Sequence, residues 1–293
     1  MTIMLEHLNA TETMPTRVVV MGAGGFVGST LVKNLQKHGF NVLGLTRKNV
    51  DLLQANAEHA LTECLQPNDA LVMVSAKAPC KSVAMLMENL RMMEVVCNVA
   101  SKANLSQVIY ISSDAVYADD VTLATETSVQ QPSSFHGMMH SVRELMLTQS
   151  VVKGTPLAIL RPSLLYGEQD PHNGYGPNKF RRLAAHGEEI TLFGNGEEQR
   201  DHIYIEDVAD IIRLTLLHRS KGTLNIATGV STAFRAIAEQ AVAIAGKKVE
   251  IKATERKNPI THRHFDITAC HKAFPKFHYT ALEQGLAKSC EPV

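Results

Sequence analysis

Cysteine is scarce in this 293-residue chain, and neither sign of charge is in excess. The five cysteines are an odd number and form no Cys-x-x-Cys pair, which predicts free thiols in a reducing cytosol. Lysine plus arginine and aspartate plus glutamate number 29 each, so the net charge is zero. A nucleic acid or an anionic membrane needs a surplus of basic charge in its protein partner, and we therefore expect neither as a partner.

Long apolar runs are also missing. No run reaches the roughly 18 to 20 residues that a membrane-spanning helix needs. Residues 1–16 contain Glu6 and Glu12 and no basic segment, so they do not fit a secretory signal, and we expect an N-terminal extension there. Hydrophobic residues make up 45% of the chain and charged residues 20%, as in a globular protein with a full core. The sequence predicts a cytoplasmic protein with no membrane partner.

Apolar runs of strand length alternate with helical patterns in the first part of the chain. The runs lie at 18–21, 41–47, 69–76, 107–113 and 157–167. Helical patterns end at Gly39, cover about 82–103, and begin again near Ser133. Continuous apolar strands between amphipathic helices are typical of a parallel sheet covered on both faces. We predict an α/β fold, a Rossmann-type doubly wound parallel sheet.

The pattern becomes shorter and more mixed after Gly167. Helical segments are expected near 179–186, 205–218 and 234–245, with short apolar stretches between them and a strand near 249–253. These segments predict a smaller C-terminal α/β lobe. We place the first domain at 17–168 with about 203–229, and the second lobe at 169–202 and 230–293.

The turn "GAGGFVG" after the first strand is a candidate cofactor site. Gly22, Gly25 and Gly28 are spaced three apart between a strand and a helix. Small residues allow close approach to a pyrophosphate, and the helix N-terminus, with Phe26 and Val27, offers free N–H groups. The alternative is a tight turn without a ligand. In its strand–turn–helix context the motif predicts that the first domain binds a dinucleotide.

Further cofactor contacts are expected where the other strands end, because ligands of such sheets lie outside the carboxyl ends of the strands. Ser75, Ala76 and Pro162 are in such positions. The second strand ends in Arg47 and Lys48, where an acidic residue would bind a ribose 2′-hydroxyl. Two cations suit a 2′-phosphate, which favours NADP over NAD, with NAD still possible. Alternatively, both are solvated surface cations.

The chain resembles the extended short-chain dehydrogenase/reductase family of nucleotide-sugar epimerases, dehydratases and 4-keto reductases. The resemblance covers nearly everything from Arg17 to Leu286. It rests on "GAGGFVG", "VIYISSDAVYA", "RPSLLYG", "LFGNGEEQRDHIYIEDVADII", "LNIATG" and "FDIT". It implies a nicotinamide dinucleotide as cofactor and a nucleoside-diphosphate sugar as substrate.

The resemblance fails at the catalytic helix. It implies a Ser or Thr after the "YISS" strand, which Ser113 matches, and a Tyr-x-x-x-Lys on the next helix. His136 stands where the tyrosine should be, and His140 stands where the lysine should be. No tyrosine lies between residues 117 and 166 to suggest another alignment. The family's frame around the pair is kept by Pro132, Gly137 and Glu144.

Three functions remain open for His136 and His140. In the first, His136 is the acid/base of an NAD(P)-dependent oxidoreductase, since an imidazole with a pKa of about 6.5 needs no cationic neighbour, and His140 holds the ribose or passes on the proton. In the second, the chain is a catalytically degenerate dinucleotide-binding protein, either a sensor or a partner subunit. In the third, the pair binds a metal, but it lacks a third ligand and a Glu base, so we expect no metal.

Asp114 bears on the type of reaction. The family's 4,6-dehydratases carry a similar Asp followed by Glu, whereas Ala115 follows here. A dehydratase is therefore disfavoured, and Asp114 is kept as a substrate contact. Reduction of a keto sugar needs one hydride transfer and epimerisation needs two, so keto-sugar reduction or epimerisation is expected, with reduction preferred.

The second lobe holds three candidate substrate contacts. Arg200 matches the family arginine that grips the sugar-nucleotide diphosphate, for which a planar guanidinium is well shaped. Arg256 stands ten residues before Asp266, much like the family's second diphosphate arginine, or is a surface charge. Asn178 is a phosphate or sugar contact, or only a helix N-cap. By resemblance, the helices near 82–103 and 136–152 form a homodimer interface.

Overall fold

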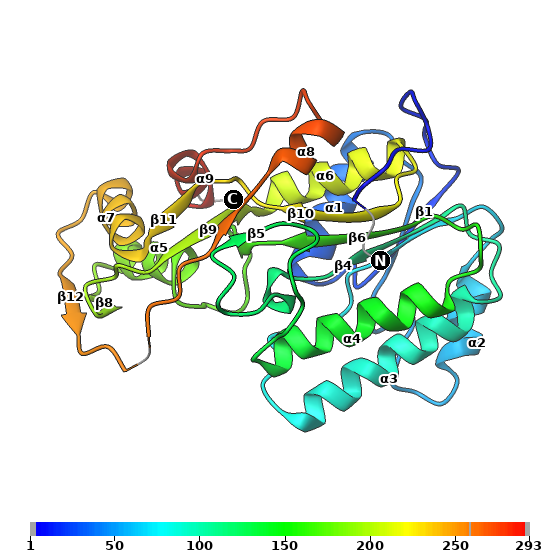
Figure 1. Ribbon diagram of the computed structural model, residues 1–293, viewed down its shortest axis with the longest axis horizontal. Coiled ribbons are helices and arrows are strands. Elements are labelled where there is room, and N and C mark those ends of the chain that lie inside the picture. Colours follow the sequence, from blue (N-terminus) through cyan, green and yellow to red (C-terminus); the bar gives the residue numbers. More distant parts are fainter. Residues whose placement is uncertain (1–3, 258, 291–293) are drawn as a thin grey trace.

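The computed structural model describes residues 4–257 and 259–290. Its centre is a six-stranded parallel sheet in the order β10-β6-β4-β3-β1-β2 (Figure 1). These strands are β1 (Val18–Met21), β2 (Val42–Leu45), β3 (Ala70–Met73), β4 (Gln107–Ile111), β6 (Leu157–Pro162) and β10 (Gly222–Ile226). The predicted α/β fold with a doubly wound parallel sheet is confirmed.

Helices cover both faces of this sheet, as its continuous apolar strands require. The helices α1 (Phe26–Lys37) and α6 (Ile205–Leu217) pack on one face, and α2 (Ala57–Cys64), α3 (Val83–Ala100) and α4 (Phe135–Ser150) lie on the other (Figure 1). Successive residues of β1 enter different cores: Val18 and Val20 join the cluster of α1 and α6, and Val19 and Met21 join that of α3. The strand therefore needs apolar residues at every position.

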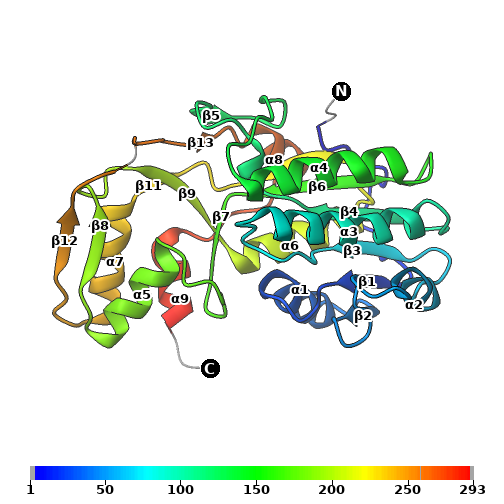
Figure 2. The same cartoon turned by 90° about the horizontal axis from the view of Figure 1, so that it is seen from below.

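A second, smaller lobe lies beside the six-stranded sheet (Figure 2). Its strands form a three-stranded and a two-stranded sheet around an aromatic core that includes Phe180 and Phe234. Its elements are β7 (Leu164–Tyr166), α5 (Pro177–His186), β8 (Ile190–Phe193), β9 (Gln199–Tyr204), β11 (Ser231–Ala233), α7 (Phe234–Ala245), β12 (Ile251–Thr254) and α9 (Leu282–Cys290). The remaining elements are the 3-10 helix η1 (Asp114–Val116), the paired strands β5 (Leu123–Ala124) and β13 (His264–Phe265), and α8 (Thr268–Ala273).

The prediction of one strand over 157–167 is wrong. The segment is two strands, β6 in the main sheet and β7 in the three-stranded sheet, and the chain changes partner at Ser163. The Ser163 amide still donates to Ile226 O at 3.0 Å, while its hydroxyl donates to Asp201 Oδ1 at 2.8 Å. A buried polar side chain thus marks the crossing from one lobe to the other. The helix expected at 234–245 has these bounds in the structure, whereas α2, α8, α9 and β9 were not predicted.

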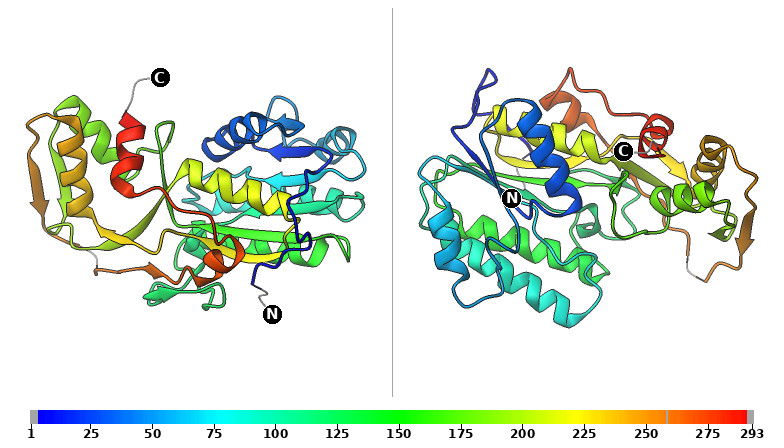
Figure 3. Two further views of the ribbon diagram at one scale, coloured as in Figure 1. Left: turned by 90° about the horizontal axis from the view of Figure 1, so that it is seen from above. Right: turned by 180° about the vertical axis from the view of Figure 1, so that it is seen from behind.

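The N-terminal extension is attached to the start of β10. Glu6 and Lys221 exchange backbone hydrogen bonds of 2.8 and 2.9 Å, and His7 bonds Ser220 Oγ and Ala273 O through its two ring nitrogens. Figure 3 shows this dark-blue segment beside the yellow strand. Within the described residues no helix has the length and apolar character to cross a membrane, and the five cysteines form no disulfide.

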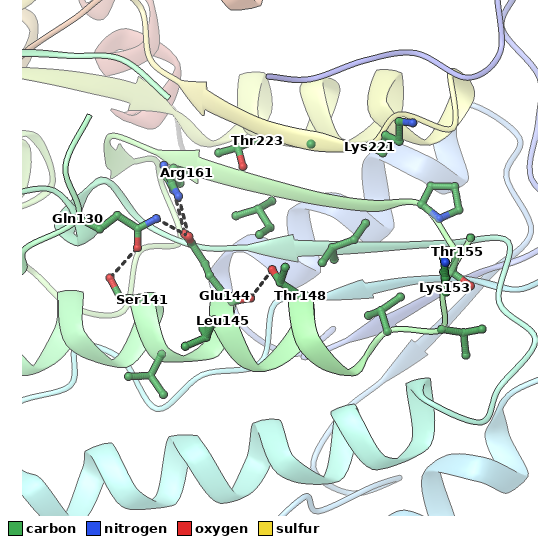
Figure 4. A pocket seen from close by; sticks show the side chains of 18 of the residues that line it. Gln130, Ser141, Glu144, Leu145, Thr148, Lys153, Thr155, Arg161, Lys221 and Thr223 are labelled. Carbon is green, nitrogen blue, oxygen red and sulfur yellow. Dashed lines mark hydrogen bonds and ion pairs between the residues drawn. The ribbon is translucent and has the colours of Figure 1, made fainter. Parts of the chain in front are cut away.

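A buried ion pair anchors α4 to the sheet. Arg161 of β6 donates to both carboxylate oxygens of Glu144, at 2.9 and 2.6 Å, and Ser112 Oγ donates to the same carboxylate. Gln130 adds a bond at 3.0 Å. Figure 4 shows this cluster on the wall of a cavity of about 830 Å³ between α4 and the β6–β10 edge. None of the sequence-predicted site residues lines that cavity, and the cluster's role is to hold α4 in place.

His202 of β9 makes the stability depend on pH. Its ring is buried edge-on against Phe234, at 5.5 Å between centroids, and burial lowers its pKa to about 3. On acidification, His202 in the unfolded chain binds a proton near pH 6.5, whereas in the folded chain it stays neutral until a much lower pH. The free energy of unfolding therefore falls as the pH falls. His202→Phe removes this effect. Between about pH 7.5 and 5 the wild type should lose about 2 kcal/mol of unfolding free energy relative to the variant, measured by urea denaturation.

The matched control for this experiment is His186→Gln, because His186 is exposed at the end of α5. Its difference from the wild type should not change over the same pH range. A difference between wild type and His202→Phe that stays constant with pH would contradict the assignment.

Candidate active site

The glycine turn after β1 is packed so tightly at Gly22 and Gly28 that only glycine fits at these two positions. A Cβ on Gly22, whose φ is +96°, would lie 2.8 Å from the Ser75 amide nitrogen, and one on Gly28 would lie 2.1 Å from Gly22 O. The helix N-cap is Gly25, which offers no side-chain cap, so the first N–H groups of α1 remain available. This cradle fits a dinucleotide pyrophosphate, and it brings Ser75 of the β3 end against the turn.

The end of β2 lies next to the same turn. A Cβ on Gly24 would be in van der Waals contact with Thr46, and the Thr46 amide donates to Asn49 Oδ1 at 2.9 Å. The loop carries Arg47 and Lys48 into solvent, where neither forms an ion pair within the described residues. Both cations can therefore receive an anion beside the cradle.

The other predicted cofactor contacts are placed around this point. Phe26 and Val27 are half-buried in the first turn of α1, and Phe26 approaches Gly167 closely enough that a Cβ there would lie 3.2 Å from its ring. Ala76 is half-buried after β3, and Pro162 ends β6 opposite Ile226. The carboxyl ends of β1, β3 and β6 thus carry these residues.

The start of α4 is pressed onto η1. A Cβ on Gly137 would lie 1.9 Å from Ala115 O, so this glycine is required by close backbone approach. Ser113 caps η1, its hydroxyl accepting from the Ala115 amide at 3.1 Å. His136 immediately precedes Gly137. The packing therefore brings the segments of Ser113 and His136 together at the end of β4.

The two histidines contact each other in α4. Their ring centroids are 4.8 Å apart and the rings are perpendicular. The Cys80 amide donates to His136 Nδ1 at 3.4 Å, which leaves Nε2 outside that bond. Burial lowers the pKa of His136, and the nearby His172 adds to this effect. In the part of the chain described, no group of three potential metal ligands forms around them.

His140 is more deeply buried and is held by Tyr110 of β4. The Tyr110 hydroxyl and His140 Nδ1 are 2.7 Å apart. Burial raises the pKa of Tyr110 and lowers that of His140 well below its usual range, with His136 and Arg143 lowering the latter further. Tyr110 therefore keeps its proton and His140 is neutral, and either the phenol O–H donates to Nδ1 or an Nδ1–H donates to the phenol oxygen.

Asp114 is buried beside Ser113. The Ser113 hydroxyl lies 3.4 Å from Asp114 Oδ1. Burial raises the pKa of the Asp114 carboxyl, and the charges of Arg263 and Arg200 partly offset this. Arg263, which the sequence analysis missed, also donates to the backbone oxygens of Asp114 and Ala118, both at 2.8 Å. The substrate-lobe arginine Arg200 is thus close enough to influence Asp114.

The two predicted diphosphate arginines are brought together by a carboxylate. Arg200 Nε donates to Glu198 Oε1 at 2.9 Å, and Arg256 Nη1 donates to Glu198 Oε2 at 3.2 Å. Arg256 also pairs with Glu197 at 3.5 Å. The sequence analysis missed Glu198, although its spacing of two from Arg200 on an extended segment predicts a shared face. An anion of two linked charges could replace this carboxylate.

Asn178 is not at this cluster. Its side chain accepts from the Gly167 amide at 3.1 Å and donates to Leu165 O at 3.3 Å, tying α5 to the end of β7. The N-cap of α5 is Gly176, so the N-cap alternative is wrong. The amide group of Asn178 is buried and engaged with the backbone.

Known proteins share this fold. The NAD dependent epimerase/dehydratase family matches residues 18–227. UDP-glucose 4-epimerase of Thermotoga maritima, solved with UDP-glucose, is 24% identical, with a TM-score of 0.78 over 94% of this chain and 97% of that one. UDP-glucose 4-epimerase of Thermus thermophilus, in complex with NAD, is 22% identical, with a TM-score of 0.79 over 94% and 97%.

A third structure is GDP-L-fucose synthetase of Naegleria fowleri bound to NADP, which is 14% identical, with a TM-score of 0.83 over 97% of this chain and 95% of that one. At these identities the structures establish the shared fold. The family match covers the glycine cradle, η1, the histidine pair and Arg200 in one continuous segment. The chain belongs to the NAD dependent epimerase/dehydratase family.

Proposed function

We propose that the protein is an NAD(P)-dependent oxidoreductase or epimerase of a nucleoside-diphosphate sugar, with keto-sugar reduction preferred and His136 as its acid/base. The observation that carries this proposal is the close packing of Gly137 on Ala115. This contact holds His136 beside the Ser113 segment at the carboxyl ends of the strands, where the glycine turn after β1 also lies. A bound nicotinamide dinucleotide would supply or take the hydride.

The environment of His136 suits proton transfer. Because burial lowers its pKa, the imidazole is neutral near pH 7. To accept a proton from a sugar hydroxyl at Nε2, the ring must carry its own proton on Nδ1 and give up the 3.4 Å bond from the Cys80 amide. In the direction of reduction, His136 first takes up a proton from solvent, and the imidazolium, a stronger acid than a free histidine, gives it to the ketone oxygen as hydride reaches the carbon. Ser113 and the buried Asp114 are the neighbouring groups that would bind this oxygen.

A second candidate function is a dinucleotide-binding protein without chemistry, a sensor or a partner subunit. The absence of the family's tyrosine and lysine at positions 136 and 140 favours it. Both functions include cofactor binding, so hydride transfer is what separates them. The cytoplasmic location and a homodimer through α3 and α4, which lie side by side in Figure 1, stay predictions.

His136→Ala should lower hydride transfer by about 10² or more, because it removes the acid/base, while the affinity for cofactor is retained. The measurement is NADPH oxidation over a panel of keto sugars and sugar nucleotides, with cofactor binding followed by fluorescence. His59→Ala, at an exposed position of α2, is the control and should keep full activity. Unchanged activity in His136→Ala would exclude this residue as the catalyst, and no turnover with any panel member would favour the second candidate.

Arg47→Ala should weaken NADPH binding about tenfold and leave NADH binding unchanged, because the guanidinium is proposed to meet the 2′-phosphate only. Titration of both cofactors into wild type and variant measures this. Arg91→Ala, an exposed cation of α3, serves as the control for loss of surface charge. An equal loss for both cofactors would show that Arg47 does not select between them.

Glu198→Gln should raise the affinity for UDP or GDP about tenfold, since the two guanidiniums lose the carboxylate that now neutralises them. Calorimetric titration with each nucleotide measures the change. Glu197→Gln is the matched control: this side chain is more exposed, pairs with Arg256 but not with Arg200, and also accepts from the Asn195 amide at 3.0 Å, so its effect should be smaller. Weaker nucleotide binding by Glu198→Gln would contradict a diphosphate site at this pair.

A further inference from the structure

Arg143 is a buried cation without an acidic partner. Arg143 is 0% exposed, and among the residues that the structure describes no carboxylate forms an ion pair with its guanidinium. Its Nη2 donates to Ser75 O at 2.8 Å, and its Nη1 lies 3.5 Å from Met139 Sδ. A buried, unpaired charge costs folding free energy, so we expect the Arg143 guanidinium to have a function in this position.

The Arg143 guanidinium is linked to the histidine pair through Tyr110. Arg143 follows His140 by three residues, so both are on one face of α4. Its Cζ is 5.3 Å from the centre of the Tyr110 ring, a cation–π contact, and the Tyr110 hydroxyl bonds His140 Nδ1 at 2.7 Å. The contacts thus run without a gap from Arg143 through Tyr110 to His140 and, by ring contact at 4.8 Å, to His136.

The other charged groups nearby are already neutralised. On α4 itself, Glu144 is bound by Arg161. Glu88 of α3, which packs against α4, pairs with Lys77 at 2.7 Å, and Asp114 of η1 lies by Arg263. Arg143 therefore acts on His140 as an uncompensated positive charge, whereas the charged neighbour that affects His136 is His172.

We propose that Arg143, through Tyr110, is a positioning residue that holds His140 as the neutral Nε2–H tautomer, so that His136 alone exchanges protons in the reaction. The role in the reaction rests on the proposed function; the tautomer itself does not. A positive charge close to His140 opposes a second charge on its ring, and the phenol hydroxyl occupies the nitrogen that would have to be protonated. The fixed cation that the family places at position 140 thus comes from one turn further along the same helix.

The test is nitrogen NMR of ¹⁵N-histidine-labelled full-length protein without ligands, over about pH 8 to 5.5, with the His140 signals assigned by His140→Gln. In the wild type, His140 should show an unprotonated Nδ1 and a protonated Nε2 throughout. In Arg143→Met burial still lowers the pKa of His140, but the cation that favours the phenol as donor is gone, so the expected change is the appearance of the Nδ1–H tautomer rather than a full titration. Arg143→Lys, which keeps the charge, should retain the wild-type tautomer.

Tyr110→Phe gives a second route that leaves the cation in place. It should free His140 Nδ1, and the ring should then populate both neutral tautomers, while burial, with Arg143 adding to it, still keeps the ring uncharged. A His140 that titrates in the wild type over this range, or that keeps the same tautomer and titration in Arg143→Met and Tyr110→Phe, would overturn the proposal. The expected tautomers together with no hydride transfer would reject the proposed function and leave the positioning of His140 by Arg143 established.

Discussion

The site depends on how α4 is fixed to the sheet. The ion pair between Glu144 and Arg161 is buried, bidentate and supported by Ser112, so α4 cannot shift along β6 without exposing two unpaired charges to a low-dielectric interior. At the other end of the contact, Gly137 allows the helix to touch the backbone of η1. These two restraints set the position of every side chain on the inward face of α4, including both histidines and Arg143.

Within that frame the charges are arranged differently from the family pattern. A tyrosine needs a cation beside it to lose its proton near pH 7, whereas a histidine does not. Here His136 and His140, the proposed catalytic positions, are imidazoles whose pKa burial lowers, and the cation Arg143 is one turn away and enclosed. A positive charge, that of Arg143, thus lies near the two histidines, but it is buried and does not reach solvent.

In the second lobe, positive side chains are neutralised within the protein by a carboxylate. Arg200 and Arg256 come from β9 and from the segment after β12, and the carboxylate of Glu198 holds them together. A cluster whose positive charges are already paired is stable without a ligand, so the proposed binding of a diphosphate there would require it to displace the carboxylate. Ser163 and Asp201, at the crossing between lobes, join this lobe to the sheet that carries the cofactor cradle.

The sequence by itself determined the doubly wound sheet, the glycine turn and the placement of His136 and His140 four residues apart on one helix. These follow from local spacing: apolar runs alternate with helical patterns, and Gly22, Gly25 and Gly28 are separated by fixed intervals. The tertiary structure alone decided that 157–167 divides between two sheets, that Asn178 bonds the backbone, that Arg143 packs on Tyr110 beside His140, and that Glu198 joins Arg200 to Arg256. The reason is physical: each depends on contacts between residues far apart in the chain, such as Glu198 with Arg256 or Arg143 with Ser75, and on burial, which local spacing does not encode.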